Sequence, residues 1–115
     1  MKVTRRTLRA AYRLLAEIPP FANRELPPAV AVRMTPARMH PWGEYVYDER
    51  SRPRHTMRVN SALRSFNAIL RTVAHEMCHL ALNQTGARGA FSHGPQFRRL
   101  ASRVCREMRW KHGGF

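Results

Sequence analysis

The segment from Phe66 to Asn83 constrains the fold most, because its residues have the periodicity of a helix that is covered on two sides. One stripe at helical spacing is apolar, and the opposite side carries small, apolar and histidine side chains, with arginine only near its start. The apolar stripe comprises Phe66, Ile69, Leu70, Val73, Met77 and Leu80. A helix with this pattern lies inside a domain. The sequence therefore predicts a central buried helix, capped by Ser65 or Asn67.

The rest of the chain predicts shorter elements on either side of this helix. Helical spacing is found twice more, and three β-prone runs lie between turn residues rich in proline and glycine. The expected elements are a helix over Thr4–Ile18, strands over Ala29–Met34, Glu44–Tyr47 and Thr56–Val59 with a hairpin loop over Asp48–Arg54, and a last helix from Pro95 to about Trp110. This order predicts one α+β domain over residues 1–115, with three main helices and a short, mainly antiparallel sheet.

Arginine dominates the charge of the chain. Lysine and arginine number 21 against seven acids, which gives a net charge of +14, and 19 of the 21 are arginine. A GC-rich genome explains arginine in place of lysine, but it does not explain the shortage of acids. Such a charge favours polyanions such as nucleic acid, although it also serves solubility alone. The expected contacts are Arg98, Arg99, Arg103, Arg106 and Arg109 on the last helix, with Arg5, Arg6, Arg9 and Arg13 on the first.

The cysteine count and the lack of long apolar runs exclude several classes of protein. No run approaches the ~18 apolar residues of a membrane span. Cys78 and Cys105 are too few for a disulfide framework or for a four-cysteine zinc ribbon, so a cytoplasmic location is expected. Arg9 and Arg13 interrupt what would be the apolar part of a signal peptide.

The central helix carries the motif His75-Glu76-Met77-Cys78-His79. Residues four apart on a helix are neighbours on one face, so both imidazoles can reach a single ion, and neutral imidazole suits Zn2+. Glu76 lies about 100° round the helix, which places its carboxylate beside the metal, where a bound water would sit. Two histidines and a glutamate on a buried face would be costly without an ion.

A catalytic zinc site needs a third protein ligand. The candidates are His93, His40, His55 and His112, together with the few acids. Thirteen residues with two glycines separate His79 from His93, which is enough chain for a turn back to the same ion.

Together, His75-Glu76-Met77-Cys78-His79 and His93-Gly94-Pro95-Gln96-Phe97 resemble the signature of the SprT-like (Spartan-type) metalloproteases, HExxH followed by HGxxF. The resemblance covers roughly residues 21–109. It implies a zincin-like α+β fold, zinc held by His75, His79 and His93, and Glu76 as the catalytic carboxylate. It also implies proteolysis of proteins associated with or crosslinked to DNA, single strands being preferred.

One departure from the family concerns DNA. Many members continue into a cysteine-based zinc ribbon, which this sequence lacks. Contacts to DNA would then come from the chain's own arginines or from a partner.

We therefore expect a zinc-dependent metalloendopeptidase with a protein substrate, DNA as a partner and no membrane association. The alternatives are a basic nucleic-acid-binding module with a structural or regulatory zinc site, and a zinc hydrolase for a non-protein bond. Tyr45, Tyr47 and His55 are candidates for a hydrogen bond to the oxyanion of the reaction.

Overall fold

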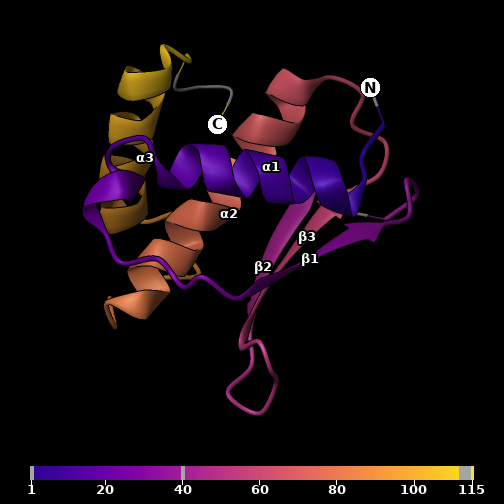
Figure 1. Cartoon of the computed structure of the whole chain (residues 1–115). Coiled ribbons are helices and arrows are strands. Elements are labelled where there is room, and N and C mark those ends of the chain that lie inside the picture. Colours follow the sequence, from indigo (N-terminus) through magenta and orange to yellow (C-terminus); the bar gives the residue numbers. More distant parts are fainter. Residues whose placement is uncertain (1, 40, 112–114) are drawn as a thin grey trace.

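The structure is a computed structural model that describes residues 2–39, 41–111 and 115. Over these residues the chain forms three α-helices, three strands and one short 3-10 turn (Figure 1). In chain order they are α1 (Arg5–Ala16), η1 (Phe21–Asn23), β1 (Val30–Thr35), β2 (Gly43–Tyr47), β3 (His55–Asn60), α2 (Phe66–Gln84) and α3 (Pro95–Met108). This confirms the predicted α+β class, with three helices and a small sheet.

Helix α2 lies at the centre of the molecule, as its pattern predicts. It contacts α1, α3, β2 and β3, and α1 crosses in front of it in Figure 1. Most of its residues from Ile69 to Leu82 are buried. The core around it contains Leu8 and Leu15 of α1, Val32 of β1, Met57 and Val59 of β3, and Leu100 and Val104 of α3.

Side-chain hydrogen bonds cap the starts of α1 and α2, and a residue with left-handed backbone conformation ends α3. Thr4 and Thr7 form a reciprocal capping box at the start of α1. The hydroxyl of Ser65 accepts a hydrogen bond of 3.1 Å from the Ala68 backbone N–H, so Ser65 rather than Asn67 caps α2. Helix α3 ends at Arg109, whose left-handed backbone (φ 58°) turns the chain.

The sheet differs from the prediction in one pairing. The strand order is β1-β3-β2, with β2 and β3 antiparallel and β1 and β3 parallel. The prediction of a mainly antiparallel sheet was therefore wrong for β1. The parallel pairing of β1 with β3 follows from the order of the strands. The chain reverses its direction once between β1 and β2 and again in the hairpin between β2 and β3, so β1 and β3 run the same way. Apolar alternation in a strand does not specify the direction of its neighbour.

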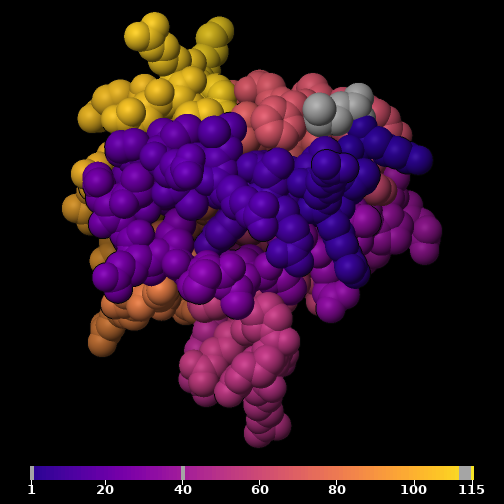
Figure 2. Space-filling model, in the orientation of Figure 1, coloured from indigo at the N-terminus to yellow at the C-terminus, as the bar shows by residue number. Residues whose placement is uncertain are grey.

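Strand β2 is the strand next to α2 at the edge of the sheet. Among the described residues no strand pairs with its outer edge. The loop that joins β2 to β3 spans residues 48–54, as predicted, and is closed by a hydrogen bond of 2.9 Å from the Asp48 N–H to the Arg54 carbonyl. Figure 2 shows this loop projecting beyond the body of the molecule. Because β2 contacts α2, the unpaired edge of β2 lies close to the helix that carries the histidine motif.

Candidate metal centre

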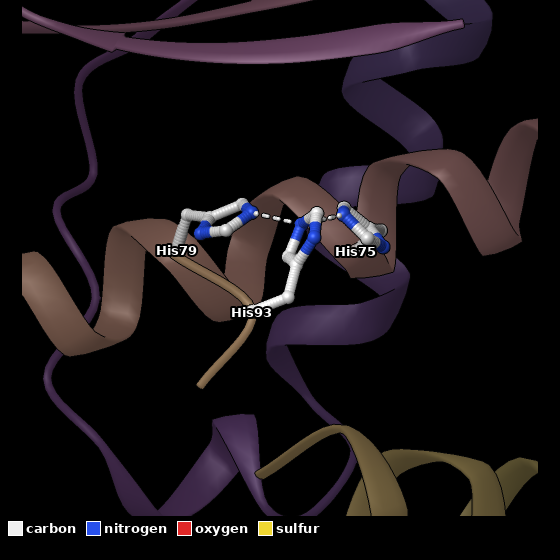
Figure 3. A group of neighbouring side chains, drawn as sticks. All are labelled: His75, His79 and His93. Atoms are coloured by element: carbon white, nitrogen blue, oxygen red, sulfur yellow. Dashed lines mark hydrogen bonds between the residues drawn. The ribbon is translucent and has the colours of Figure 1, made fainter. Parts of the chain in front are cut away.

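Helix α2 presents His75 and His79 on the same face, one turn apart, with ring centroids separated by 5.3 Å. His93 reaches them from the loop before α3. Its Nε2 atom lies 3.1 Å from Nε2 of His75 and 3.3 Å from Nε2 of His79 (Figure 3). The three ligand atoms lie within 4.8 Å of one another, and they form a histidine cluster placed to bind a metal ion.

The spacing of these nitrogens fits a small ion. Ligand nitrogens on a tetrahedral zinc ion, with bonds of about 2.0–2.1 Å, lie roughly 3.4 Å apart. Both nitrogen–nitrogen distances from His93 are close to this value. A cation at the centre of the cluster could accept a lone pair from each of the three neutral imidazoles at once.

The loop before α3 determines where His93 lies. Gly86 and Gly89 both have a φ of +71°, a conformation that other residues rarely adopt, and they turn the chain back toward α2. The hydroxyl of Ser92 then donates a 2.8 Å hydrogen bond to the Gly89 carbonyl. The buried ring of Phe97 packs against the three imidazoles at 4.5–4.9 Å between centroids, which fixes the start of α3 beside them.

Hydrogen bonds select the tautomer of the buried histidine. Nδ1 of His79 lies 2.7 Å from the carbonyl oxygen of Ala90, and because a carbonyl only accepts, Nδ1 carries the proton. Nε2 of His79 therefore keeps its lone pair toward the centre of the cluster, as a metal ligand requires. This role of Ala90 could not be predicted from the sequence, because only the loop before α3 brings the donor and the acceptor together.

Burial keeps the two helical histidines neutral. It lowers the pKa of His75 to about 4, with further lowering by the nearby rings of His79 and His93, while a hydrogen bond to the Phe115 backbone partly opposes the shift. Burial also lowers the pKa of His79. Both imidazoles are therefore in the form that binds a metal at neutral pH.

The carboxyl group of Glu76 lies between α2 and β2. It is 6% exposed, and burial together with the negative charge of Glu44 raises the pKa of Glu76 to about 7, although a hydrogen bond from the Tyr45 backbone partly opposes the shift. A Cβ atom on Gly43 would lie 3.0 Å from a carboxylate oxygen of Glu76 and 2.6 Å from the Thr72 methyl group. Glycine at this position lets β2 approach the helix closely. A carboxyl group with a pKa near neutrality can both take and return a proton.

The other predicted site residues have different surroundings. The Tyr45 hydroxyl lies 2.7 Å from Nδ1 of His55 and accepts a 3.1 Å hydrogen bond from the Asn83 amide. His55 is thus paired with Tyr45 and is not part of the histidine cluster, while Tyr47 packs against the His55 ring. The sequence did not indicate the role of Asn83.

Two of the candidate third ligands, His40 and His112, lie outside the described residues. Among the residues that the structure describes, the cluster of His75, His79 and His93 is the group found with metal-ligand spacing.

Arginines cover the outer side of α3. Four of them line a shallow hollow with Ser102, and all five predicted contacts are exposed. The hollow is lined by Arg98, Arg99, Arg103 and Arg106. Arg98 also lines a second hollow that contains His75 and His93. Over the described residues the one ion pair joins Arg58 to Glu44 on the sheet, so the α3 arginines have no acidic partner there.

The fold and the site together define a small α+β protein with a cluster of three histidines, two of them on one helix, placed to bind a metal ion. The chain belongs to the SprT-like family, which it matches over residues 12–112. The matched region contains every residue of the cluster and the whole arginine face of α3. A search of curated proteins finds no match. None of the helices in the described part of the chain has the length and apolar character needed to cross a membrane.

Proposed function

We propose that this protein is a zinc-dependent endopeptidase that cleaves proteins associated with DNA. The observation that carries the proposal is the convergence of three imidazole nitrogens on the helix face next to the buried carboxyl group of Glu76. Structural zinc sites normally have four protein ligands, often cysteines, whereas catalytic sites have three and keep one position open. This argues against the alternative of a nucleic-acid-binding module with a structural zinc ion.

Each residue has a definite task in this proposal. Zinc held by His75, His79 and His93 would polarise the scissile carbonyl and make a bound water more acidic. Glu76, buried beside the histidine cluster, would take a proton from the attacking water and return it to the leaving amine. The hydrogen bond from His79 to Ala90 holds the imidazole in its binding tautomer.

The outer edge of β2 supports binding of an extended peptide. An added strand would use the backbone N–H and C=O groups of β2 that no other described strand pairs with. The close approach of Gly43 to Glu76 brings that edge beside the catalytic carboxyl group. A peptide bound in this way would lie across the metal centre.

The arginine face of α3 supports association with DNA. Guanidinium groups match phosphate geometry and stack on bases, and the absence of acidic partners over the described residues leaves these groups free for phosphates. Arg98 reaches from this face to a hollow that also contains His75 and His93. Protein bound to the same DNA would therefore be presented close to the metal centre.

The proposal is tested by comparing zinc-loaded wild type, Glu76→Gln and the control Glu49→Gln, which changes an exposed glutamate in the β2–β3 loop. Histone is incubated with each protein, with and without single-stranded DNA, and fragments are followed by electrophoresis. We expect cleavage by wild type and by Glu49→Gln that DNA stimulates, and none by Glu76→Gln, while all three retain zinc. Equal cleavage by Glu76→Gln would instead favour a structural zinc site.

A further inference from the structure

Trp110 and Lys111, which follow α3, lie along one side of α2. Asn67, Arg71 and His75 are spaced four residues apart and so share a face of the helix. The indole N–H of Trp110 donates a 3.2 Å hydrogen bond to the side-chain oxygen of Asn67. The guanidinium of Arg71 donates to the Lys111 carbonyl at 3.3 Å and stacks over the Trp110 ring at 5.2 Å. These contacts hold the start of this segment next to the metal-binding face.

Phe115 continues the same row of contacts up to the metal centre. Its ring centroid lies 5.5 Å from that of His75, 6.5 Å from Phe97 and 6.1 Å from Trp110. The end of the chain is seen beside α2 in Figure 1. The ring is partly buried, although nothing in the helical pattern of α3 requires an aromatic residue at this point.

Two hollows meet at His75 and Phe115. One has a volume of about 420 Å³ and lies toward β2, and the other has a volume of about 390 Å³ and lies toward α3. Apolar groups form much of both walls. The first is lined in part by Pro41, Trp42, Leu63 and Ala68, and the second in part by Phe97 and Ala101. The Phe115 ring therefore fills the junction of an apolar groove that runs past the metal ligands.

We propose that this groove is a subsite for a large apolar side chain of the peptide substrate, and that the Phe115 ring occupies it until substrate displaces the ring. Glu76 lines the groove on one side and His93 on the other, so a side chain bound there belongs to a residue next to the scissile bond. The inference rests on the proposed peptidase function and names the substrate class for that site.

When the Phe115 ring occupies the groove, it weakens substrate binding by a factor that depends on how often the groove is open. The apparent affinity falls in proportion to the fraction of molecules whose groove is open. Partial burial of a phenyl ring keeps that fraction on the order of one in ten, so removal of the ring strengthens binding of an apolar peptide about tenfold. A peptide with no large apolar side chain does not use the groove and gains nothing.

The test uses the zinc-loaded Glu76→Gln protein, which binds but does not cleave, with and without Phe115→Ala. Phe115→Ala removes the phenyl ring and keeps the backbone group of residue 115 that forms a hydrogen bond with His75. The probes are two short fluorescein-labelled glycine–serine peptides, one with a central phenylalanine and one with serine in its place, followed by fluorescence anisotropy. Leu14→Ala, which removes an exposed apolar side chain of α1, is the matched control.

We expect Phe115→Ala to bind the phenylalanine peptide about tenfold more tightly, with Phe115→Leu in between and Leu14→Ala unchanged. No gain, an equal gain for both peptides, or no binding of the phenylalanine peptide would each overturn the inference. Cleavage of histone in the presence of single-stranded DNA by proteins with Glu76 intact is measured in parallel. If histone is cleaved but the peptide affinities are unchanged, the subsite inference fails alone. If histone is not cleaved, the peptidase function fails, and the binding data still decide the subsite.

Discussion

Replacing Glu76 with glutamine should stabilise the metal-free protein above neutral pH. The ordinary pKa of this carboxyl group is 4.5, and in the folded protein it is about 7. Each tenfold change in proton affinity corresponds to about 1.4 kcal/mol, so ionised Glu76 costs the folded state about 3 kcal/mol. Glutamine has the same shape and can still accept the hydrogen bond from the Tyr45 backbone, but it carries no charge to desolvate.

The sign of the pH dependence follows from the raised pKa. Below about 4.5 the carboxyl group is protonated in both the folded and the unfolded chain, and the two proteins should be equally stable. Between about pH 4.5 and 7 the unfolded chain releases this proton while folded Glu76 keeps it, so wild type loses stability relative to Glu76→Gln. Above about pH 7 the carboxyl group is ionised in both states and the difference stays constant. The histidines titrate alike in both proteins, so their contributions cancel in the difference.

The assay is urea unfolding in the presence of EDTA, followed by circular dichroism at pH 5 and pH 8. We expect Glu76→Gln to exceed wild type by about 3 kcal/mol at pH 8 and by well under half of that at pH 5. The exposed control Glu49→Gln should match wild type at both. A difference that does not change with pH, or no stabilisation at pH 8, would refute the reasoning that burial of the carboxylate is costly.

Three further predictions concern the metal, the sheet and DNA. His93→Ala should lower zinc occupancy sharply, measured by plasma mass spectrometry, whereas His55→Ala should not; the reverse result would mean that the third ligand was wrongly chosen. Gly43→Ala should reduce peptide cleavage at least tenfold with zinc retained, because its Cβ would lie 2.6 Å from the Thr72 methyl group and 3.0 Å from Glu76. Wild-type activity in this variant would show that β2 can move away freely. Reversing three α3 arginines together should weaken binding of single-stranded DNA at about 0.15 M salt and reduce the salt slope by at least about 2, with zinc content unchanged.

The DNA prediction needs a control of equal charge. The three α3 substitutions are Arg98→Glu, Arg103→Glu and Arg106→Glu. The control reverses three exposed arginines on other elements, namely Arg33, Arg38 and Arg50. If the affinity for DNA falls by the same factor in the two triple variants, net charge rather than the arginine face of α3 accounts for DNA binding. If wild type does not bind at that salt and DNA does not stimulate cleavage, the DNA-linked part of the proposal fails.

The elements that sequence could predict are those whose signals are local. The two-sided apolar pattern predicted α2 as the central buried helix, and Ser65 was one of the two residues expected to cap it because its side chain can accept from the first turn. The direction of β1 could not be predicted, because alternation within a strand does not determine which neighbour it pairs with.

The same distinction applies to the site. The spacing of His75 and His79 on a helix predicted two ligands of one ion, and the resemblance to the SprT-like signature singled out His93 among the candidate third ligands. The Ala90 carbonyl that orients His79 and the Phe115 ring beside His75 were not predicted, since both depend on contacts between segments far apart in the chain.

Hydrolysis in water enriched in oxygen-18 tests the central claim most directly. The zinc-loaded wild type is incubated with histone and single-stranded DNA in this water, and the protein fragments are examined by mass spectrometry. We expect new carboxyl ends that carry the heavy oxygen in the wild-type sample and none in the Glu76→Gln sample. Labelled ends in equal amount from Glu76→Gln, or no new carboxyl ends from wild type that holds one zinc ion per chain, would contradict the assignment of this site as a peptidase centre.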